Sequence, residues 1–281
     1  MPHYILTLQC PDQTGLVRAI SGALVEVGAN IVEQAQFTDP VSDQFFLRTR
    51  FETSIEDVSA LTESIGAAVS FMDPDFQVWP EERKQRVLIM VSQQDHCLID
   101  LLYRMDIGEL PIEVPVIVSN HATCAPIAER HGIAFVHLPV TAQTKAAQEE
   151  ELLRLVADHD IDLIVLARYM QILGTAVCEA LPGRIINIHH SFLPGFKGAN
   201  PYLQAYDRGV KLIGATAHFV TADLDEGPII DQDVQRVSHS RSPEQLAAIG
   251  RDTERLVLAR AVRHAAEHRI FINDHRTVVF D

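Results

Sequence analysis

Apolar residues in the first eighty positions recur with two different periods. Short runs rich in apolar and β-branched residues are typical of strands, whereas two longer stretches space their apolar residues three or four apart, as helices do. The resulting order, βαββαβ, predicts a small α+β domain of the ferredoxin-like kind, with two helices on one face of a four-stranded antiparallel sheet. The expected strands are residues 4–9, 31–37, 45–51 and 71–78, and the expected helices are residues 16–27 and 55–69.

The pattern changes after residue 86, where continuous apolar strands alternate with amphipathic helices. Such alternation predicts an α/β domain built on a doubly wound, mostly parallel sheet that is covered on both faces. The expected strands are residues 87–91, 114–119, 134–138, 163–166 and 185–188, with neighbouring strands at 213–220 and 228–237. The expected helices are residues 97–105, 122–131, 145–158, 171–180 and 243–268.

A charged stretch separates the two patterns. It runs Pro80-Glu-Glu-Arg-Lys-Gln-Arg86 and contains no apolar residue after the proline. We therefore expect a first domain at residues 1–80, a linker at 81–86 and a second domain at 87–281.

Charge and cysteine spacing exclude several classes of function. Thirty-eight acidic against twenty-three basic side chains give a net charge of −15, which argues against nucleic acid as the main partner. The four cysteines are scattered, so neither a thiolate metal site nor a redox pair is indicated. No window of eighteen apolar residues suggests a membrane span, and the first residues lack the pattern of a signal peptide. We expect a cytoplasmic protein.

The end of the predicted strand 185–188 carries unexpected polar residues. Side chains alternate along a strand, so Asn187 and His189 point the same way. An amide and an imidazole aimed at one spot can hold a carbonyl oxygen as it becomes an oxyanion. Because ligands of open α/β sheets bind beyond the carboxyl ends of strands, this strand end is a candidate site.

A second polar stretch follows another predicted strand. His218-Phe-Val-Thr-Ala-Asp-Leu-Asp225 leads through Glu and Gly to Pro228. Asp225 could supply the carboxylate that the Asn187/His189 pair lacks and could orient a water molecule.

These two stretches resemble the catalytic signature of the folate-dependent formyltransferase fold. Asn187-Ile-His189-His-Ser-Phe-Leu-Pro194 and Asp225-Glu-Gly-Pro228 carry the resemblance, which covers residues 86–281. It implies that Asn187, His189 and Asp225 act on the formyl group of 10-formyltetrahydrofolate. It also implies folate-binding positions at Met170, Gln171, Ile172, Leu173, Val220 and Thr221. Lys197 is a candidate partner of the folate's glutamate tail or a solvated loop residue, and the role of Arg168 stays open.

The first eighty residues look like an ACT domain, on the basis of Asp12-Gln-Thr-Gly15-Leu and Gly28-Ala-Asn30-Ile31. An ACT domain before a formyl-handling domain resembles the formyltetrahydrofolate deformylase family, as do residues 167–173 and 189–198. The resemblance implies a hydrolase acting on a linear amide C–N bond, which releases formate and tetrahydrofolate. It further implies a supply of formate to purine (IMP) biosynthesis and a balance of the one-carbon folate pool.

The loop after the first strand of the second domain bears on the choice of acceptor. A nucleotide acceptor needs backbone N–H groups that hold its phosphate, commonly in a glycine-rich loop. Residues Ser92–Cys97 contain no glycine, and Asp95 would repel a phosphate. We therefore expect water as the acceptor, with formyl transfer to an amine such as glycinamide ribonucleotide as the alternative.

Two other functions compete with this interpretation. His189, His190, His218 and Asp225 are metal-ligand types, but no compact ligand spacing supports a metal hydrolase, and we expect neither metal nor cofactor. The other is a non-catalytic amino-acid sensor. ACT domains bind small amino acids between paired copies, which implies a regulatory ligand near Asp12, Gly15, Asn30 and Ile31, and a homodimer or homotetramer. Gly15 could instead only permit a tight turn, and Asn30 only end a helix.

Overall fold

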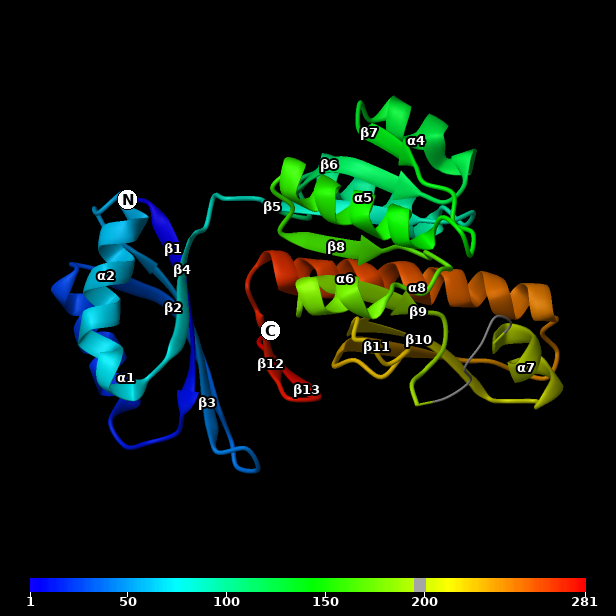
Figure 1. Ribbon diagram of the computed structural model, residues 1–281. Helices are drawn as coiled ribbons and strands as arrows, with labels where there is room; N and C mark the ends of the chain where they lie inside the picture. The colour runs from blue at the N-terminus through cyan, green and yellow to red at the C-terminus, as the bar shows by residue number, and fades with distance from the viewer. Residues whose placement is uncertain (195–200) are drawn as a thin grey trace. The chain divides into compact units, whose positions relative to one another are not determined.

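The computed structural model describes residues 1–194 and 201–281, and these form two compact units (Figure 1). Unit 1 comprises Met1–Lys84, Glu267–Asn273 and Thr277–Asp281. Unit 2 comprises Gln85–Ala266 and Asp274–Arg276. The first boundary falls inside the expected linker. Most residues after Ala266 belong to unit 1, whereas the sequence pattern assigned them to the second domain.

Unit 1 is built on a four-stranded sheet in which every neighbour is antiparallel. The strand order is β2-β3-β1-β4, which is the arrangement that a βαββαβ chain with both helices on one face requires. The strands are β1 (His3–Pro11), β2 (Asn30–Asp39), β3 (Gln44–Glu52) and β4 (Asp75–Pro80). The helices are α1 (Leu16–Glu26) and α2 (Val58–Val69), and a 3-10 turn at Ser70–Met72 precedes β4.

The two helices cover one face of this sheet. Leu6 and Leu8 on β1 alternate toward Ile20 on α1 and Leu61 and Ile65 on α2, and all are completely buried. Burial of such side chains contributes about 1.5–3 kcal/mol each. The helical and strand periods read from the sequence therefore meet in one core.

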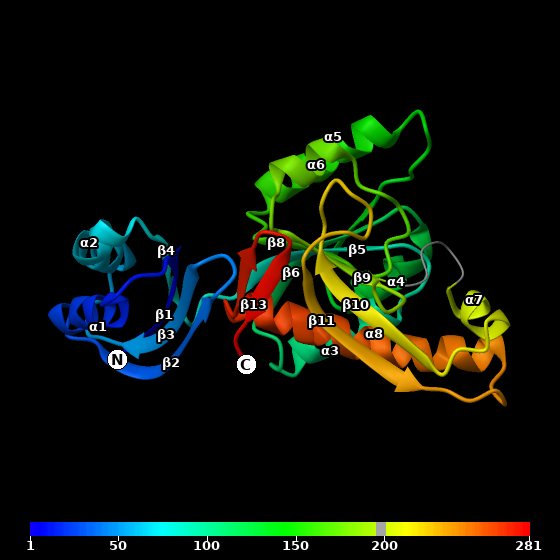
Figure 2. The ribbon, with the colours of Figure 1, turned by 90° about the horizontal axis from the view of Figure 1, so that it is seen from below.

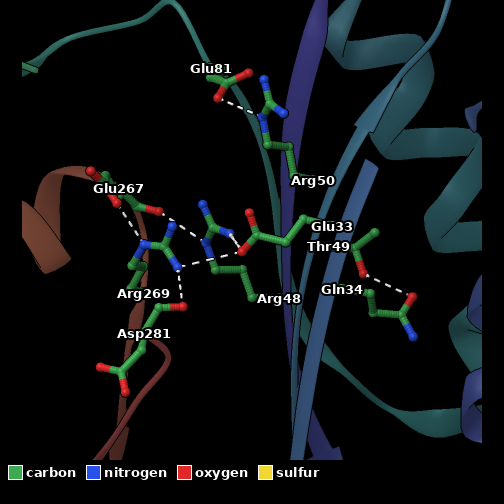
Figure 3. A network of polar contacts seen from close by, with 9 residues as sticks. All are labelled: Glu33, Gln34, Arg48, Thr49, Arg50, Glu81, Glu267, Arg269 and Asp281. Atoms are coloured by element: carbon green, nitrogen blue, oxygen red, sulfur yellow. Dashed lines mark hydrogen bonds and ion pairs between the residues drawn. The ribbon is translucent and has the colours of Figure 1, made fainter. Parts of the chain in front are cut away.

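A C-terminal hairpin packs on the other face of the same sheet. It consists of β12 (Ile270–Asn273) and β13 (Arg276–Val279). Phe271 and Phe280 close over Phe46, which explains why the end of the chain belongs to unit 1. Polar contacts beside this cluster join Arg48 of β3 to Glu33 of β2 and to Glu267 (Figure 3).

Unit 2 is built on a seven-stranded sheet of order β11-β10-β9-β8-β5-β6-β7. The strands from β9 to β7 are parallel, as predicted, whereas β10 runs antiparallel to both of its neighbours. The sheet is therefore mixed. The strands are β5 (Gln85–Val91), β6 (Ile112–Ser119), β7 (Ala134–His137), β8 (Leu163–Leu166), β9 (Ile185–His189), β10 (Leu212–Phe219) and β11 (Ile229–Arg236).

Helices cover both faces of this sheet (Figure 2). On one face, α5 and α6 bury apolar side chains against Leu88 and Met90 of β5. On the other face, α3 and α8 pack together, and α8 lies along β9, β10 and β11. The helices are α3 (His96–Asp106), α4 (Ala125–Arg130), α5 (Lys145–Asp158), α6 (Thr175–Ala180), α7 (Pro201–Asp207) and α8 (Pro243–Ala266), with a 3-10 turn at Ala122–Cys124. None of the described helices combines the length and the apolarity that a bilayer crossing requires.

One helix of unit 2 begins later than its sequence pattern suggested. Helix α6 starts after Gly174, so residues 171–173 form a loop instead of a first helical turn. The backbone N–H of Gly174 donates to the Glu149 carboxylate on α5 at 2.7 Å, which fixes the entry to the helix. The loop left in front of α6 forms a wall of the candidate site.

Candidate active site

A cavity of about 310 Å³ lies where β8 and β9 end. The polar groups predicted from the sequence, Asn187, His189 and Asp225, all line it. The predicted folate-binding positions Met170, Gln171, Ile172, Leu173, Val220 and Thr221 line it as well. Lys197 lies outside the described residues. The tertiary structure thus brings the two polar stretches of the sequence to one place.

Asn187 is held by a neighbour across the sheet, His218 of β10. These two residues are direct partners in the β9–β10 pair, and Asn187 Nδ2 lies 3.2 Å from His218 Nε2. The other ring nitrogen, His218 Nδ1, lies 2.8 Å from the carbonyl oxygen of Phe219, which can only accept. His218 therefore carries its proton on Nδ1 and accepts at Nε2. The amide of Asn187 must present its NH₂ group to the ring, and a second amide hydrogen remains for a ligand.

His189 is placed between a carboxylate and a hydroxyl. Its Nδ1 lies 3.3 Å from Asp225 Oδ1, and its Nε2 lies 2.8 Å from Ser191 Oγ. Both side chains of the His189–Asp225 pair are largely buried, so solvent screens the contact weakly. Asp225 fixes the orientation of the imidazole, as a carboxylate does in catalytic carboxylate–imidazole pairs.

The turn that carries Asp225 depends on a close backbone approach. Asp225 itself adopts a left-handed conformation with φ 58°. A Cβ at Gly227 would overlap the carbonyl oxygen of Phe219, whose N–H donates to the carbonyl of Pro228 at 2.9 Å. Only glycine permits the chain to fold back this tightly onto β10. The Gly-Pro exit of the motif thus sets the position of the aspartate.

Asp225 and His218 lie side by side, with 3.7 Å between Asp225 Oδ1 and His218 Nε2, and their pKa values are both lowered. The hydrogen bond with His189 lowers the pKa of Asp225, and the charges of the nearby imidazoles add to this effect despite the cost of burial. Burial lowers the pKa of His218, because desolvation disfavours the imidazolium form. At neutral pH the site therefore holds an ionised Asp225 beside a neutral His218.

The mouth of the cavity is apolar. Met170 is 47% exposed, Ile172 is 59% exposed and Leu224 is 55% exposed, although such side chains are usually covered. Together with Leu173 and Val220 they frame a slot that suits a flat, partly apolar ring.

The candidate regulatory residues of unit 1 do not meet within one chain. Asn30, at the start of β2, pairs with Glu52, which in turn pairs with His3 at the start of β1. Asp12 and Gly15 follow the other end of β1, which is about 26 Å away at 3.3 Å per residue. A ligand that contacts Asp12 and Asn30 together would therefore need a second copy of the chain.

Metal-ligand side chains gather at a different place in unit 2. Among the described residues, His96, Cys97 and Glu254 bring one ligand atom each to within 4.8 Å of one another. The Arg168 guanidinium lies 3.4 Å from Glu254, and burial raises the pKa of the Cys97 thiol well above its usual range. A positive neighbour and an un-ionised thiol make this a poor cation site.

Sequence reasoning missed two features of the site. The partnership of His218 with Asn187 depends on the β9–β10 register, which the strand pattern alone does not provide. Glu254, in the middle of α8, is completely buried and contacts Arg168, His96 and Tyr202. Nothing in the surrounding helical pattern distinguishes it from a surface glutamate.

Comparisons with known proteins extend over the whole chain. Residues 85–262 match the Formyl transferase family. The formyltetrahydrofolate deformylase of Corynebacterium sp. (strain P-1) is 46% identical over 279 residues, which cover 99% of this chain and 98% of that protein. The crystal structure of formyltetrahydrofolate deformylase from Burkholderia mallei is 49% identical, covers 100% of both chains and has a TM-score of 0.96.

A more distant structure shares only part of the chain. Glycinamide ribonucleotide transformylase 1 from Symbiobacterium toebii is 32% identical, covers 70% of this chain and 95% of its own, and has a TM-score of 0.66. The deformylases thus match both units, and residues 85–262, which match the Formyl transferase family, span Asn187, His189 and Asp225. By sequence identity over nearly its full length, the chain belongs to the formyltetrahydrofolate deformylase family.

Proposed function

We propose that the protein hydrolyses 10-formyltetrahydrofolate to formate and tetrahydrofolate, with water as the acceptor. The observation that carries this proposal is the convergence of Asn187, His189 and Asp225 in one cavity, although Asp225 lies on a separate turn. An oriented carboxylate–imidazole pair beside an amide donor suits attack on a formyl carbon. The activity supplies formate to purine biosynthesis and balances the one-carbon folate pool.

Asp225 acts as the base for the attacking water. Its pKa is lowered chiefly by the hydrogen bond with His189, so the carboxylate is ionised at neutral pH. Water forms the new C–O bond as one of its protons passes to the Asp225–His189 pair. The C–N10 bond then breaks, and the same proton moves to the departing nitrogen, which gives tetrahydrofolate and formic acid. The acid releases its proton to solvent and leaves as formate.

Asn187 and His189 stabilise the tetrahedral intermediate. The amide hydrogen that His218 does not use donates to the oxyanion. His189 donates to it from Nε2 once the ring has taken up the proton of the water, in place of the Nε2 contact with Ser191. His218 is a positioning residue here, because it acts through Asn187 rather than on the substrate. A single oxyanion donor typically contributes about 10²–10³-fold to turnover.

The pterin ring binds in the apolar slot next to these groups. Residues 170–173 and the turn that follows Val220 line this slot, where the side chains of Met170 and Ile172 are exposed. A flat heterocycle can stack against such side chains while its edge bonds to the backbone. This places the N10-formyl group near Asn187 and Asp225.

A formate-release assay tests the proposal. Purified protein is mixed with 10-formyltetrahydrofolate, with and without glycinamide ribonucleotide, and formate and tetrahydrofolate are followed directly. We expect the same formate release in both mixtures, and the same rate after exhaustive chelation because no step uses a metal ion. Turnover that requires the ribonucleotide would show a transferase instead.

Unit 1 is proposed to be an ACT-like regulatory and oligomerisation domain. Its topology supports this, and the separation of Asp12 and Gly15 from Asn30 and Ile31 favours a ligand site between two copies. We expect a homodimer or homotetramer by light scattering, together with a thermal shift by one or more small amino acids. A monomer that no amino acid shifts would contradict this role.

A further inference from the structure

The sheet of unit 2 has a switch point between β5 and β8. From β5 the chain moves outward to β6 and β7, and it then returns to place β8 on the opposite side of β5. The connections after β5 and β8 therefore leave in opposite directions, and the crevice between them is where open α/β sheets bind ligands. In this protein the crevice is filled by side chains of the chain itself.

Arg168, just beyond β8, is the first of these side chains. It is only 6% exposed and adopts a left-handed backbone conformation with φ 63°, which is uncommon for a residue with a side chain. Its Nη2 donates to Gln94 Oε1 at 3.1 Å, in the loop that follows β5. Its Nε and Nη1 have no hydrogen-bond partner, although Arg168 also lines the cavity.

Glu254 of α8 meets Arg168 from the other side. Its Oε2 lies 3.4 Å from Arg168 Nε and 2.8 Å from His96 Nε2, and its Oε1 accepts from the Tyr202 hydroxyl. Burial alone would raise the pKa of Glu254, but His96, Arg168 and Tyr202 together lower it. The crevice therefore holds a charged cluster of Arg168, Glu254, His96 and Tyr202, which we call the crevice cluster.

The crevice cluster is fitted closely and adjoins the reaction centre. A Cβ at Gly250 would overlap the hydroxyl of Tyr202, so α8 needs a glycine there to admit the ring. The Tyr202 ring lies edge-on to His190 at 6.4 Å between centroids, and His190 lies edge-on to His189 at 5.3 Å. The space beside the formyl position is thus occupied, whereas the folate slot on the other side stays open.

We propose that the crevice cluster excludes amine acceptors and so makes water the acceptor, an inference that rests on the proposed function. The fold alone does not set this choice, because a glycinamide ribonucleotide transformylase shares it. A primary amine would need the crevice that Arg168 and Glu254 fill, and its entry would have to break their buried ion pair, which leaves an uncompensated charge. Water is small enough to reach the formyl carbon without displacing them.

The test uses the full-length protein with 10-formyltetrahydrofolate and glycinamide, a small primary amine. The double variant Arg168→Gly/Glu254→Gln removes both charges together and opens space, and glycine adopts the backbone conformation of residue 168 without strain. Formyl transfer would form the amine N–C bond, break the C–N10 bond and pass one amine proton to N10. The readout is the ratio of N-formylglycinamide to formate.

We expect this ratio to rise on the order of tenfold or more in the double variant. If the double variant does not fold, the same ratio is measured with Arg168→Gly alone. The matched control is Arg260→Ala, on the same helix α8 as Glu254. Arg260 is exposed and pairs with Asp231, so the product ratio of this variant should equal that of the unmodified protein. A purely structural cluster would change stability without moving the ratio.

The outcomes separate the two proposals. If the unmodified protein releases no formate, the proposed function fails. If it releases formate and the folded variants still yield formate only, the acceptor inference alone is overturned. The acceptor inference is also overturned if the unmodified protein gives the same ratio of N-formylglycinamide to formate as the variants.

Discussion

Arg48 in unit 1 and Arg168 in unit 2 are both buried arginines, at 3% and 6% exposure, yet they are used differently. Arg48 sits on a regular strand, and its Nε and Nη1 donate to the Glu267 carbonyl and to Glu33 (Figure 3). Arg168 has a left-handed backbone, its Nε contacts Glu254 only as an ion pair at 3.4 Å, and its Nη1 has no hydrogen-bond partner. Strain and unused donors in a buried cation are more typical of functional sites than of structural joints.

The same contrast holds for the regions around the two arginines. The contacts around Arg48 attach the C-terminal hairpin to the sheet of unit 1, so their loss should appear in stability. The polar groups at the ends of β8 and β9 line a cavity and keep hydrogen-bonding capacity for a ligand, so their loss should appear in turnover. The following variants test that division.

The largest effect is expected from Asp225→Asn. The amide cannot accept the proton of the attacking water, so kcat should fall about 10³-fold, or about 4 kcal/mol in activation free energy. The melting temperature should stay within a few degrees, because asparagine has the same size and tolerates the left-handed conformation at residue 225. Formate release and thermal melting measure both, and near-normal turnover would remove Asp225 from the mechanism.

Arg48→Met should produce the opposite result. The variant loses charge-assisted hydrogen bonds to Glu33 and to the Glu267 carbonyl, so unfolding should become easier by about 2 kcal/mol while kcat stays unchanged. Chemical denaturation measures the loss. The matched control is Arg50→Met, two residues along β3, whose pair with Glu81 is more exposed and should contribute at most about 0.5 kcal/mol. Equal losses in the two variants would contradict the structural role of Arg48.

The smallest effect is expected from His218→Phe. Phenylalanine keeps an aromatic ring at this position but cannot accept from Asn187 Nδ2, so kcat should fall about tenfold with little change in KM. Burial lowers the pKa of His218, so the residue is neutral at neutral pH and protonates only on the acid side of the usual imidazole range. Protonation turns Nε2 from an acceptor into a donor and releases Asn187.

The pH profile distinguishes this positioning role from a packing role. Wild-type kcat should decline on the acid side as His218 protonates, before Asp225 does, because the pKa of that carboxyl is also lowered. In the His218→Phe variant, kcat should be lower throughout but should not decline further over the same acid range. An acid limb that is the same in both proteins would assign it to another group.

Local patterns predicted much of the fold. The alternation of Leu6 and Leu8, and the spacing of Ile20 and Leu24, are properties of short segments, and both sets lie in the core of unit 1. The C-terminal hairpin could not be assigned in the same way. Its place on unit 1 depends on Phe271 and Phe280 meeting Phe46, which lies more than two hundred positions earlier.

The sequence by itself indicated the candidate chemistry of Asn187 and His189 and a division into two domains with a linker at residues 81–86. Asn187 and His189 share a side because the period of a strand is two, and Asp225 became a candidate only in combination with them. Only the tertiary structure decided that His218 orients Asn187, and that Glu254 meets Arg168 between β5 and β8. Such contacts depend on strand register and on how α8 lies across the sheet. Both are set by long-range packing, which no local pattern encodes.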